Sequence, residues 1–307
     1  MSAEPAAPLV IWALSDGKPG HVNQTRGLVN ALADACDAQA HWMGAPGRLR
    51  SLLLLAMRRY PRRKRLPKPD LIIGAGHRTH LALLAAARAT GARSVVLMRP
   101  TLPTRWFDLC VVPEHDNVTG EHVVITRGVL NAVLPSEKSA ARTGLILIGG
   151  ISKHFRWVSA DAVRAVRDIA YRDRDTVWSL TTSRRTPADV VPALQALGFA
   201  NLRIIPFDQT DPHWVPQQLA RATRVWVTED SVSMVYEALT ARALVGLIPV
   251  PRRGLTRVAR GMDMLVRDEL VTPLNWYLSG HPMFVHDQPF NEATRVARVI
   301  LAKWFRV

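Results

Sequence analysis

Short, continuous apolar runs alternate with helical patterns along most of this chain, and this alternation limits its fold more than any other feature. A strand that is apolar on both faces must be covered on both faces, and helices that separate such strands cover a parallel sheet. In the first half, the apolar runs lie at residues 9–14, 70–74, 94–98 and 109–112, with helical patterns at 22–35 and 81–90. The pattern predicts an α/β domain with a Rossmann-like parallel sheet.

The alternation stops at a polar stretch without periodicity, residues 135–143, which we interpret as a linker. Beyond it, strands are expected at 145–148, 176–180, 202–205, 224–227 and 244–248, and helices at 160–171, 188–197, 214–221 and 232–242. We therefore predict two parallel-sheet domains, residues 1–135 and 143–287, that face an interdomain cleft. The C-terminal segment, 288–307, is expected to cross back and brace the first domain.

The net charge of +15 indicates an anionic partner. Within residues 48–68, nine side chains are basic and none is acidic, and an apolar stretch lies at 52–57. An apolar helix that runs into a cationic cluster suits an anionic membrane surface. The alternative is a core helix followed by a solvated basic loop. Nucleic acid is disfavoured as a partner, because the chain contains no recognisable nucleic-acid-binding module.

The chain shows no pattern typical of export or of a membrane span. Its N-terminus lacks a basic segment, and the apolar runs at 9–14 and 52–57 fall well short of the ~20 residues that cross a bilayer. Cys36 and Cys110 both have apolar neighbours, which favours free thiols in a reducing compartment. We expect a cytoplasmic protein that docks on the cytoplasmic face of a membrane.

The loop after the first strand combines glycines with titratable side chains. It contains Asp16, Gly17, Lys18, Gly20 and His21. The glycines let the backbone approach a ligand or adopt a positive φ, and the helix that follows presents free N–H groups to an anion. The alternative is a tight turn with solvated polar residues. We favour a ligand-binding loop that carries a base.

A second loop of the first domain contains Gly76 and His77, which we place at the same binding site. It begins like a dinucleotide-binding fingerprint, but Thr79 stands where the third glycine belongs. His77 and His80 have a spacing near one helical turn, yet no acidic or cysteine ligand lies nearby in the sequence. We therefore expect no metal site.

Three loops of the second domain have the composition of an anion site, with glycines, hydroxyls, cations and a helix start. The alternative is a set of exposed connections and an ordinary capped helix. The candidate residues of this anion-binding site are Gly149, Gly150, Ser152, Lys153, Thr181, Ser183, Arg184, Thr228, Asp230, Ser231, Ser233, Met234 and Glu237. Asp230 or Ser231 is expected to cap the helix, and Glu237 shares a helix face with Ser233.

At these residues the chain resembles the mitochondrial-fission ELM1-like family. The motifs that carry the resemblance are SDGKPGHVNQTRGL at 15–28, GGISKHF at 149–155 and VTEDSVSMVYEA at 227–238. Bacterial members of that family are described as glycosyltransferases. The resemblance covers nearly the whole chain and implies a GT-B-like fold with a nucleoside-diphosphate sugar as substrate.

More distantly, the layout is similar to GT-B glycosyltransferases such as the peptidoglycan transferase that uses UDP-GlcNAc. In this resemblance Gly17, Gly20 and His21 match an acceptor-side loop, and Glu237 matches a glutamate that binds the nucleotide ribose. The implied reaction is inverting transfer of a sugar to an acceptor hydroxyl on a glycan or lipid, without metal or cofactor. His21 is the expected base, with Asp16 second. Two alternatives stay open: a non-catalytic membrane-associated scaffold and a nucleotide-sugar epimerase.

Overall fold

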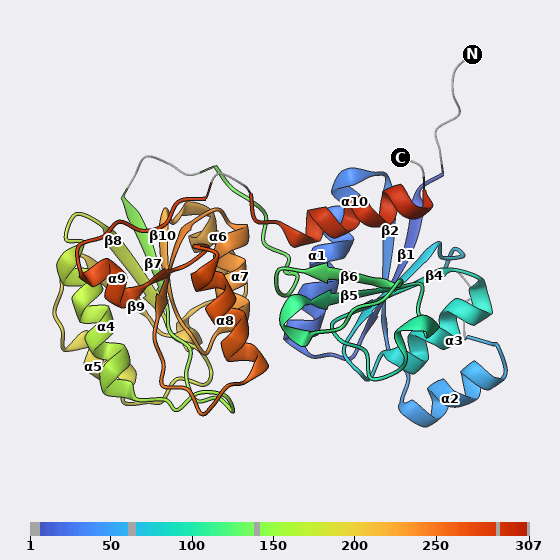
Figure 1. The fold of residues 1–307 in the computed structure, drawn as a ribbon, viewed down its shortest axis with the longest axis horizontal. Helices are drawn as coiled ribbons and strands as arrows, with labels where there is room; N and C mark the ends of the chain where they lie inside the picture. Colours follow the sequence, from blue (N-terminus) through green and yellow to red (C-terminus); the bar gives the residue numbers. More distant parts are fainter. Residues whose placement is uncertain (1–6, 61–65, 138–141, 287–288, 306–307) are drawn as a thin grey trace, which may run out of the picture. The chain divides into compact units, whose positions relative to one another are not determined.

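The computed structural model describes residues 7–60, 66–137, 142–286 and 289–305. Their contacts divide the chain into two units, Met1–Ala132 with Glu292–Val307, and Val133–Asn291, and each is described by itself. Each unit contains one six-stranded, all-parallel sheet covered by helices (Figure 1). The predicted α/β class is therefore confirmed.

The first unit has the strand order β2-β1-β3-β4-β5-β6. Its elements are β1 (Leu9–Ser15), α1 (Pro19–Ala35), β2 (Ala38–Gly44), α2 (Arg48–Ala56), β3 (Leu71–Ala75), α3 (His80–Thr90), β4 (Arg93–Leu97), η1 (Thr104–Trp106), β5 (Leu109–Pro113), η2 (Glu114–Asp116), β6 (Val123–Thr126) and α10 (Glu292–Trp304). Neighbouring residues of one strand enter different cores: Ile11 packs in a cluster with α1 and α10, and Trp12 in a cluster with α3. This double burial explains why the strands read as continuous apolar runs.

The second unit has the order β12-β11-β10-β7-β8-β9. Its elements are β7 (Thr143–Leu147), α4 (Ser159–Arg172), β8 (Val177–Thr181), α5 (Val190–Gln195), β9 (Leu202–Ile205), η3 (Phe207–Gln209), α6 (Trp214–Arg221), β10 (Arg224–Thr228), α7 (Val232–Thr240), β11 (Leu244–Ile248), α8 (Arg257–Arg267), β12 (Thr272–Pro273) and α9 (Leu274–Leu278). Two fully buried tryptophans, Trp178 and Trp226, lie across from the strand residues Gly144 and Gly246. A Cβ at either glycine would come within 2.2 Å of the indole ring, so the glycines make room for the two largest core side chains.

The helix α10 returns to the first unit and packs beside α1 (Figure 1). Val296 and Ile300 share a buried cluster with Leu28 of α1. At the start of α10, the Glu292 carboxylate accepts a hydrogen bond from the Arg127 backbone N–H (2.9 Å), which follows β6. The last helix in sequence therefore covers the sheet formed by the first 126 residues.

Several elements differ from the sequence prediction. The strands β2 and β6 and the helix α8 were not predicted, because both strands are edge strands with partly exposed side chains, and α8 follows a long polar loop. The helix predicted at 22–35 begins earlier, with Pro19 at its first position. Proline suits that position because its fixed φ is helical and its missing N–H is not needed there. Gly20 therefore lies inside α1, and only Gly17 of the two loop glycines has a positive φ, +80°.

Both cysteines of the chain are free; Cys110 is buried and Cys36 partly so. Burial raises the pKa of the Cys110 thiol to about 12, so this thiol stays protonated near neutral pH. Across the described part of the chain, no helix has both the length and the hydropathy of a membrane span.

Each sheet has one point at which the chain reverses its direction of winding. In the first unit the reversal lies between the neighbouring strands β1 and β3, and in the second between β7 and β10. The loops that leave such a pair run to opposite faces and open a crevice at the carboxyl ends of the strands, which is where open α/β sheets bind ligands. The topology thus selects the loops after β1, β3, β7 and β10.

A matched pair of substitutions tests the close packing of α1 against the backbone of Asn131. A Cβ at Gly27 would lie 2.1 Å from the Asn131 carbonyl oxygen, whereas a Cβ at Gly20 would meet no atom within 4 Å. We expect Gly27→Ala to lower the free energy of unfolding by about 1–3 kcal/mol, because backbone cannot move aside. Gly20→Ala should be neutral or stabilising by up to about 1 kcal/mol, through helix propensity. Urea denaturation measures both, and equal effects would contradict the packing described here.

Candidate functional site

The loop after β1 and the first turn of α1 bring Asp16 and His21 together. The positive φ of Gly17 turns the chain directly after Asp16, and the backbone N–H of Lys18 donates to the Asp16 carboxylate (3.1 Å). One helical turn later, His21 places its Nδ1 2.9 Å from the other carboxylate oxygen. The Asp16 side chain is fully buried, whereas the His21 ring is 18% exposed. The pair thus consists of a fixed carboxylate and an accessible imidazole.

Gly76, in the loop after β3, is required for this pair to exist. It has φ +84°, and a Cβ at this position would lie 2.3 Å from the His21 ring and 3.2 Å from the Asp16 carboxylate. The His21 ring therefore packs directly on the backbone of the neighbouring loop. The structure brings Gly76 to His21 as the sequence predicted, but its role is to leave room for the ring.

The electrostatics of the pair favour an ionised Asp16. Burial by itself raises the pKa of Asp16, but the hydrogen bonds from His21 and from the Lys18 backbone, with the charges of both side chains, outweigh burial and lower that pKa. When the His21 ring is neutral, its Nδ1 carries the proton donated to the ionised Asp16, and its Nε2 has the lone pair that a base needs. This is the arrangement of a general base oriented by a carboxylate.

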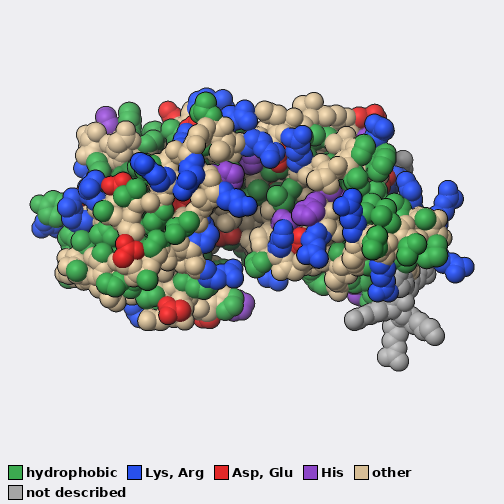
Figure 2. All heavy atoms as spheres, turned by 90° about the horizontal axis from the view of Figure 1, so that it is seen from below, with side chains coloured by type: hydrophobic (Ala, Val, Ile, Leu, Met, Phe, Trp, Pro, Cys, Tyr) green, Lys and Arg blue, Asp and Glu red, His purple; other side chains and the backbone are tan. Residues whose placement is uncertain are grey.

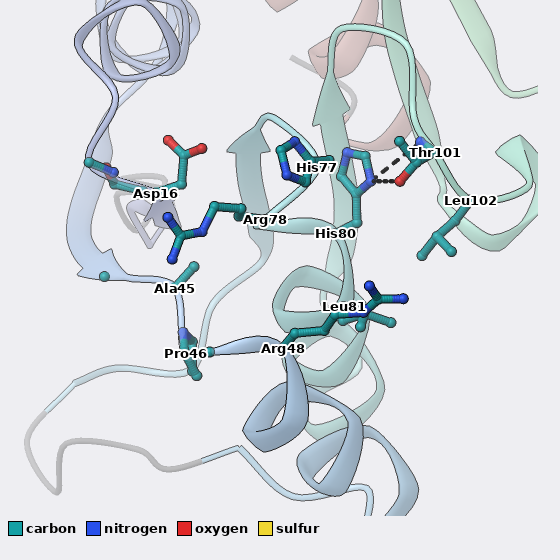
Figure 3. Close-up of a pocket in the computed structure, with 14 residues that line it drawn as sticks. Asp16, Ala45, Pro46, Arg48, His77, Arg78, His80, Leu81, Thr101 and Leu102 are labelled. Atoms are coloured by element: carbon teal, nitrogen blue, oxygen red, sulfur yellow. Dashed lines mark hydrogen bonds between the residues drawn. The ribbon is translucent and has the colours of Figure 1, made fainter.

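A cavity of about 830 Å³ adjoins Asp16 (Figure 3). It is formed within the first unit by the loops after β1, β2, β3 and β4, and the predicted residues Gly17 and His77 also line it. The predicted residues Lys18, Gly20, His21 and Gly76 do not line the cavity, so Asp16 is the member of the carboxylate–imidazole pair that reaches it. Residues that the sequence argument did not select are Arg48, Arg78, His80 and Thr101.

In the second unit, the loops after β7 and β10 are joined by hydrogen bonds. The Gly149 N–H donates to Thr228 Oγ1 (2.7 Å), and the Gly150 N–H donates to the Asp230 carboxylate (2.9 Å). A Cβ at Gly149 would lie 2.2 Å from Ser231 Oγ, so only glycine allows this close approach. Both glycine N–H groups are already used, and their role in this structure is to fix the two loops against each other.

The two acids in the loop after β10 are each paired with an arginine. Asp230 is buried, and Arg185 NH1 lies 2.9 Å from its carboxylate, while Arg185 NH2 donates to Ser231 Oγ (3.2 Å). Glu229 forms an ion pair with Arg252, which also bonds to Asp263 (3.0 Å). Hydrogen bonds from Arg252 to Asp263 and Glu229 raise the pKa of its guanidinium, which stays charged. These pairs offset the negative charge near the start of α7.

Ser231 is the N-cap residue of α7, as predicted, although its side chain makes no capping hydrogen bond. The first N–H groups of α7 have no intrahelical acceptor. Ser233 is exposed in the first turn, and Met234 and Glu237 are half-buried on the same helix. This helix start is therefore open to an anion, with a carboxylate one turn along.

The other predicted donor residues have different surroundings. Ser183 Oγ donates to the Gly149 carbonyl (2.9 Å), and Ser152 Oγ accepts from the Phe155 N–H (3.2 Å), so both hydroxyls stabilise loops. Lys153 is exposed. Thr181 is buried, with an Oγ1 that has no partner among the described residues. Arg184 stacks over Phe207, 5.7 Å from the ring centroid, so the guanidinium beside Asp230 comes from the next residue instead.

The sequence profile of the family described as mitochondrial fission ELM1 matches residues 19–304 of this chain. The chain belongs to the ELM1 family. This agrees with the resemblance of the loop motifs, which include the Asp16–His21 loop and the start of α7. Among curated proteins, the chain is 24% identical to an uncharacterised protein of Rickettsia prowazekii (strain Madrid E), over 94% of this chain and 97% of that protein.

Solved structures with the same fold are known for enzymes of nucleotide-sugar metabolism. A protein assigned as UDP-N-acetylglucosamine 2-epimerase from Listeria monocytogenes matches with a TM-score of 0.59 and 13% identity, over 98% of both chains. The UDP-GlcNAc 2-epimerase of Neisseria meningitidis, solved with UDP-GlcNAc bound, matches with a TM-score of 0.53 and 9% identity, over 98% of this chain and 100% of that chain. The predicted GT-B-like fold of this ELM1 family member is thereby confirmed.

No group of three or more His, Cys, Asp or Glu suited to a metal ion occurs in residues 7–60, 66–137, 142–286 and 289–305. The first unit thus contains a carboxylate–imidazole pair, and the second unit contains two acids paired with arginines beside the start of α7.

Substitution of His21 tests the coupling of the pair. In His21→Ala, Asp16 loses a hydrogen bond and a positive neighbour but stays buried, so its pKa should rise. The lowered pKa of Asp16 stabilises the folded wild type at pH values above the pKa of this group in the unfolded chain, and this stabilisation is lost as pH falls. The variant lacks it, so the difference in stability between wild type and variant should be largest at neutral pH. NMR titration of the Asp16 carboxyl carbon measures the shift. His77→Ala is the control, and an unchanged Asp16 pKa in His21→Ala would contradict the coupling.

Proposed function

We propose that the chain is a glycosyltransferase that moves a sugar from a nucleoside-diphosphate donor, bound by the second unit, to an acceptor hydroxyl that the first unit activates. The observation that carries this proposal is the Asp16–His21 pair, a base oriented by a buried carboxylate at the reversal point of the first sheet. The shared fold with nucleotide-sugar enzymes supports a nucleotide-sugar ligand. The fold alone does not distinguish transfer from epimerisation.

The start of α7 is the proposed site of the donor diphosphate. Free N–H groups and the partial positive charge of a helix N-terminus attract phosphate oxygens. Arg185 and Arg252 neutralise the neighbouring acids, so a diphosphate would not face a net negative loop. Glu237, one turn along, is placed to accept hydrogen bonds from ribose hydroxyls. N–H groups and cations can stabilise the leaving diphosphate without a metal ion.

The transfer step uses His21 as base. The acceptor oxygen forms a bond to the anomeric carbon, the bond from that carbon to the diphosphate breaks, and its electron pair leaves with the diphosphate. The hydroxyl proton passes to Nε2 of His21, and Asp16 stabilises the imidazolium that forms. Attack from the face opposite the leaving group inverts the anomeric centre.

A donor screen tests the proposal. Calorimetry with UDP-, GDP-, ADP- and CMP-sugars should show binding of one nucleotide class to the full chain. Glu237→Gln should weaken that binding about tenfold or more, as expected for the loss of charged hydrogen-bond acceptors. The exposed Glu137 of the same unit provides the matched control, Glu137→Gln, which should bind as the wild type does.

The same screen separates the alternatives. His21→Ala should bind donor normally but lose turnover with acceptor. Conversion of donor to an epimer in the absence of acceptor would assign an epimerase instead. Absence of binding for all four classes would leave a non-catalytic scaffold and refute the transferase.

We further propose that α2 docks the protein on an anionic membrane, on the cytoplasmic face. Its apolar side chains point outward: Leu49, Leu52 and Leu53 are 79%, 44% and 63% exposed. At its end, Arg58 and Arg59 line a shallow hollow of about 450 Å³. Basic side chains are also far more frequent than acidic ones on the face shown in Figure 2. The predicted cluster at 48–68 lies partly outside the described residues, since 61–65 are not described.

Vesicle sedimentation tests this docking. Leu52→Gln with Leu53→Gln should lower partitioning onto vesicles of phosphatidylcholine and phosphatidylglycerol at least tenfold, because each exposed leucine contributes about 1.5–3 kcal/mol when buried in lipid. The control pair, Leu134→Gln with Leu255→Gln, removes leucines that are exposed in the other unit and should have no effect. Equal binding of both double variants would exclude α2 as the docking surface.

A further inference from the structure

The cavity beside Asp16 is large enough to hold a small molecule. Its volume of about 830 Å³ lies within the ordinary range for sites that enclose small molecules. Four loops of one sheet edge supply its walls, and all lining residues belong to the first unit. The apolar part of the lining comes from Ala45, Pro46, Leu81 and Leu102. The cavity therefore has room for a ligand group next to Asp16.

Two arginines without a partner line this cavity. Arg48 is the first residue of α2, and Arg78 lies in the loop between β3 and α3. Neither makes an ion pair or a hydrogen bond with any residue that the structure describes. Figure 3 shows Arg78 reaching toward Ala45 and Arg48 reaching along Leu81. Asp16 supplies the acidic group of the lining, and it is already bonded to His21. The cavity is therefore left with two uncompensated positive charges.

A buried histidine adds a hydrogen-bond donor. His80 is 2% exposed, and its Nδ1 accepts from the Thr101 backbone N–H (3.4 Å), with Thr101 Oγ1 at 3.1 Å. Burial, followed by the charges of His77 and His21, lowers the pKa of His80 to about 4, so the ring is neutral near pH 7. In the tautomer in which Nδ1 accepts from Thr101, the proton lies on Nε2, and that buried nitrogen has no partner among the described residues. A ligand oxygen in the cavity would supply the acceptor that this donor lacks.

We propose that this cavity binds an acceptor that carries a phosphate group, with Arg48 and Arg78 supplying positive charge and His80 a neutral donor. The proposal rests on the proposed transferase and names its acceptor class. Two guanidinium groups carry two positive charges, which a phosphate ester with up to two negative charges matches better than a carboxylate with one. The phosphate belongs either to a lipid headgroup or to a water-soluble phosphate ester. A phosphate bound here would lie in the cavity that Asp16 lines, and Asp16 in turn holds His21.

Calorimetry on the full chain with octyl phosphate, glycerol 3-phosphate and octanol tests the site. Octyl phosphate should bind the wild type and octanol should not. Arg48→Gln with Arg78→Gln should weaken octyl phosphate binding about tenfold or more, since charge-assisted hydrogen bonds are lost. The control pair Arg88→Gln with Arg298→Gln removes the same charge from exposed positions of this unit and should change binding less than twofold. Arg78→Lys, which keeps the charge, should retain part of the affinity.

The outcomes distinguish a lipid headgroup from a soluble phosphate ester as the source of the phosphate. They also distinguish failure of the phosphate site from failure of the proposed transferase. Tighter binding of octyl phosphate assigns a lipid acceptor, and equal binding of glycerol 3-phosphate assigns a soluble one. Equal weakening by both arginine pairs, or displacement of octyl phosphate by saturating UDP-GlcNAc, would overturn the phosphate site. UDP-GlcNAc binding, measured on the same proteins, should not depend on Arg48 or Arg78. Octyl phosphate binding in a chain that binds no nucleotide sugar would refute the transferase and leave the phosphate site standing.

Discussion

The burial of both faces of each sheet is the constraint on which the rest of this structure depends. A parallel sheet covered by helices on both sides cannot use its faces for ligands, since those faces are filled by side chains such as Trp12 and Trp226. Polar chemistry is therefore confined to the loops at the carboxyl ends of the strands. The reversal of winding then decides which loops meet: those after β1 and β3 in the first unit, and those after β7 and β10 in the second.

The second unit shows how acids can remain near a proposed anion site. Asp230 is buried next to a helix start that favours negative charge, and a second carboxylate, Glu229, precedes it. Each is bonded to an arginine from another loop, so that the charges balance within the protein. A buried carboxylate without such a partner would destabilise the fold strongly. Arg185 and Arg252 therefore support the loop geometry whether or not a ligand is bound.

The sequence predicted much of the fold because its strands are buried on both faces and read as unbroken apolar runs. It failed at the two edges of the first sheet: β2 has a partly polar sequence that resembles a loop, and β6 is an apolar run of only four residues. For the site, the motifs indicated Asp16 and His21, because residues close in sequence stay close in space. Arg48, Arg78 and His80 line one cavity because β2, β1 and β3 lie side by side in the sheet, and no spacing in the sequence encodes that order. Arg185 could not be distinguished from Arg184 by type, since only loop geometry decides which one faces Asp230.

The contact between Gly76 and the His21 ring also limits how this site can change. The ring occupies the volume that any side chain at position 76 would need. Positions 21 and 76 therefore cannot vary independently, although they lie 55 positions apart in the chain. A larger residue at 76 becomes tolerable only after the imidazole has gone, and a chain that has taken that step cannot recover its base by restoring histidine alone. Redesign of this site must therefore change position 21 before position 76, or change both together.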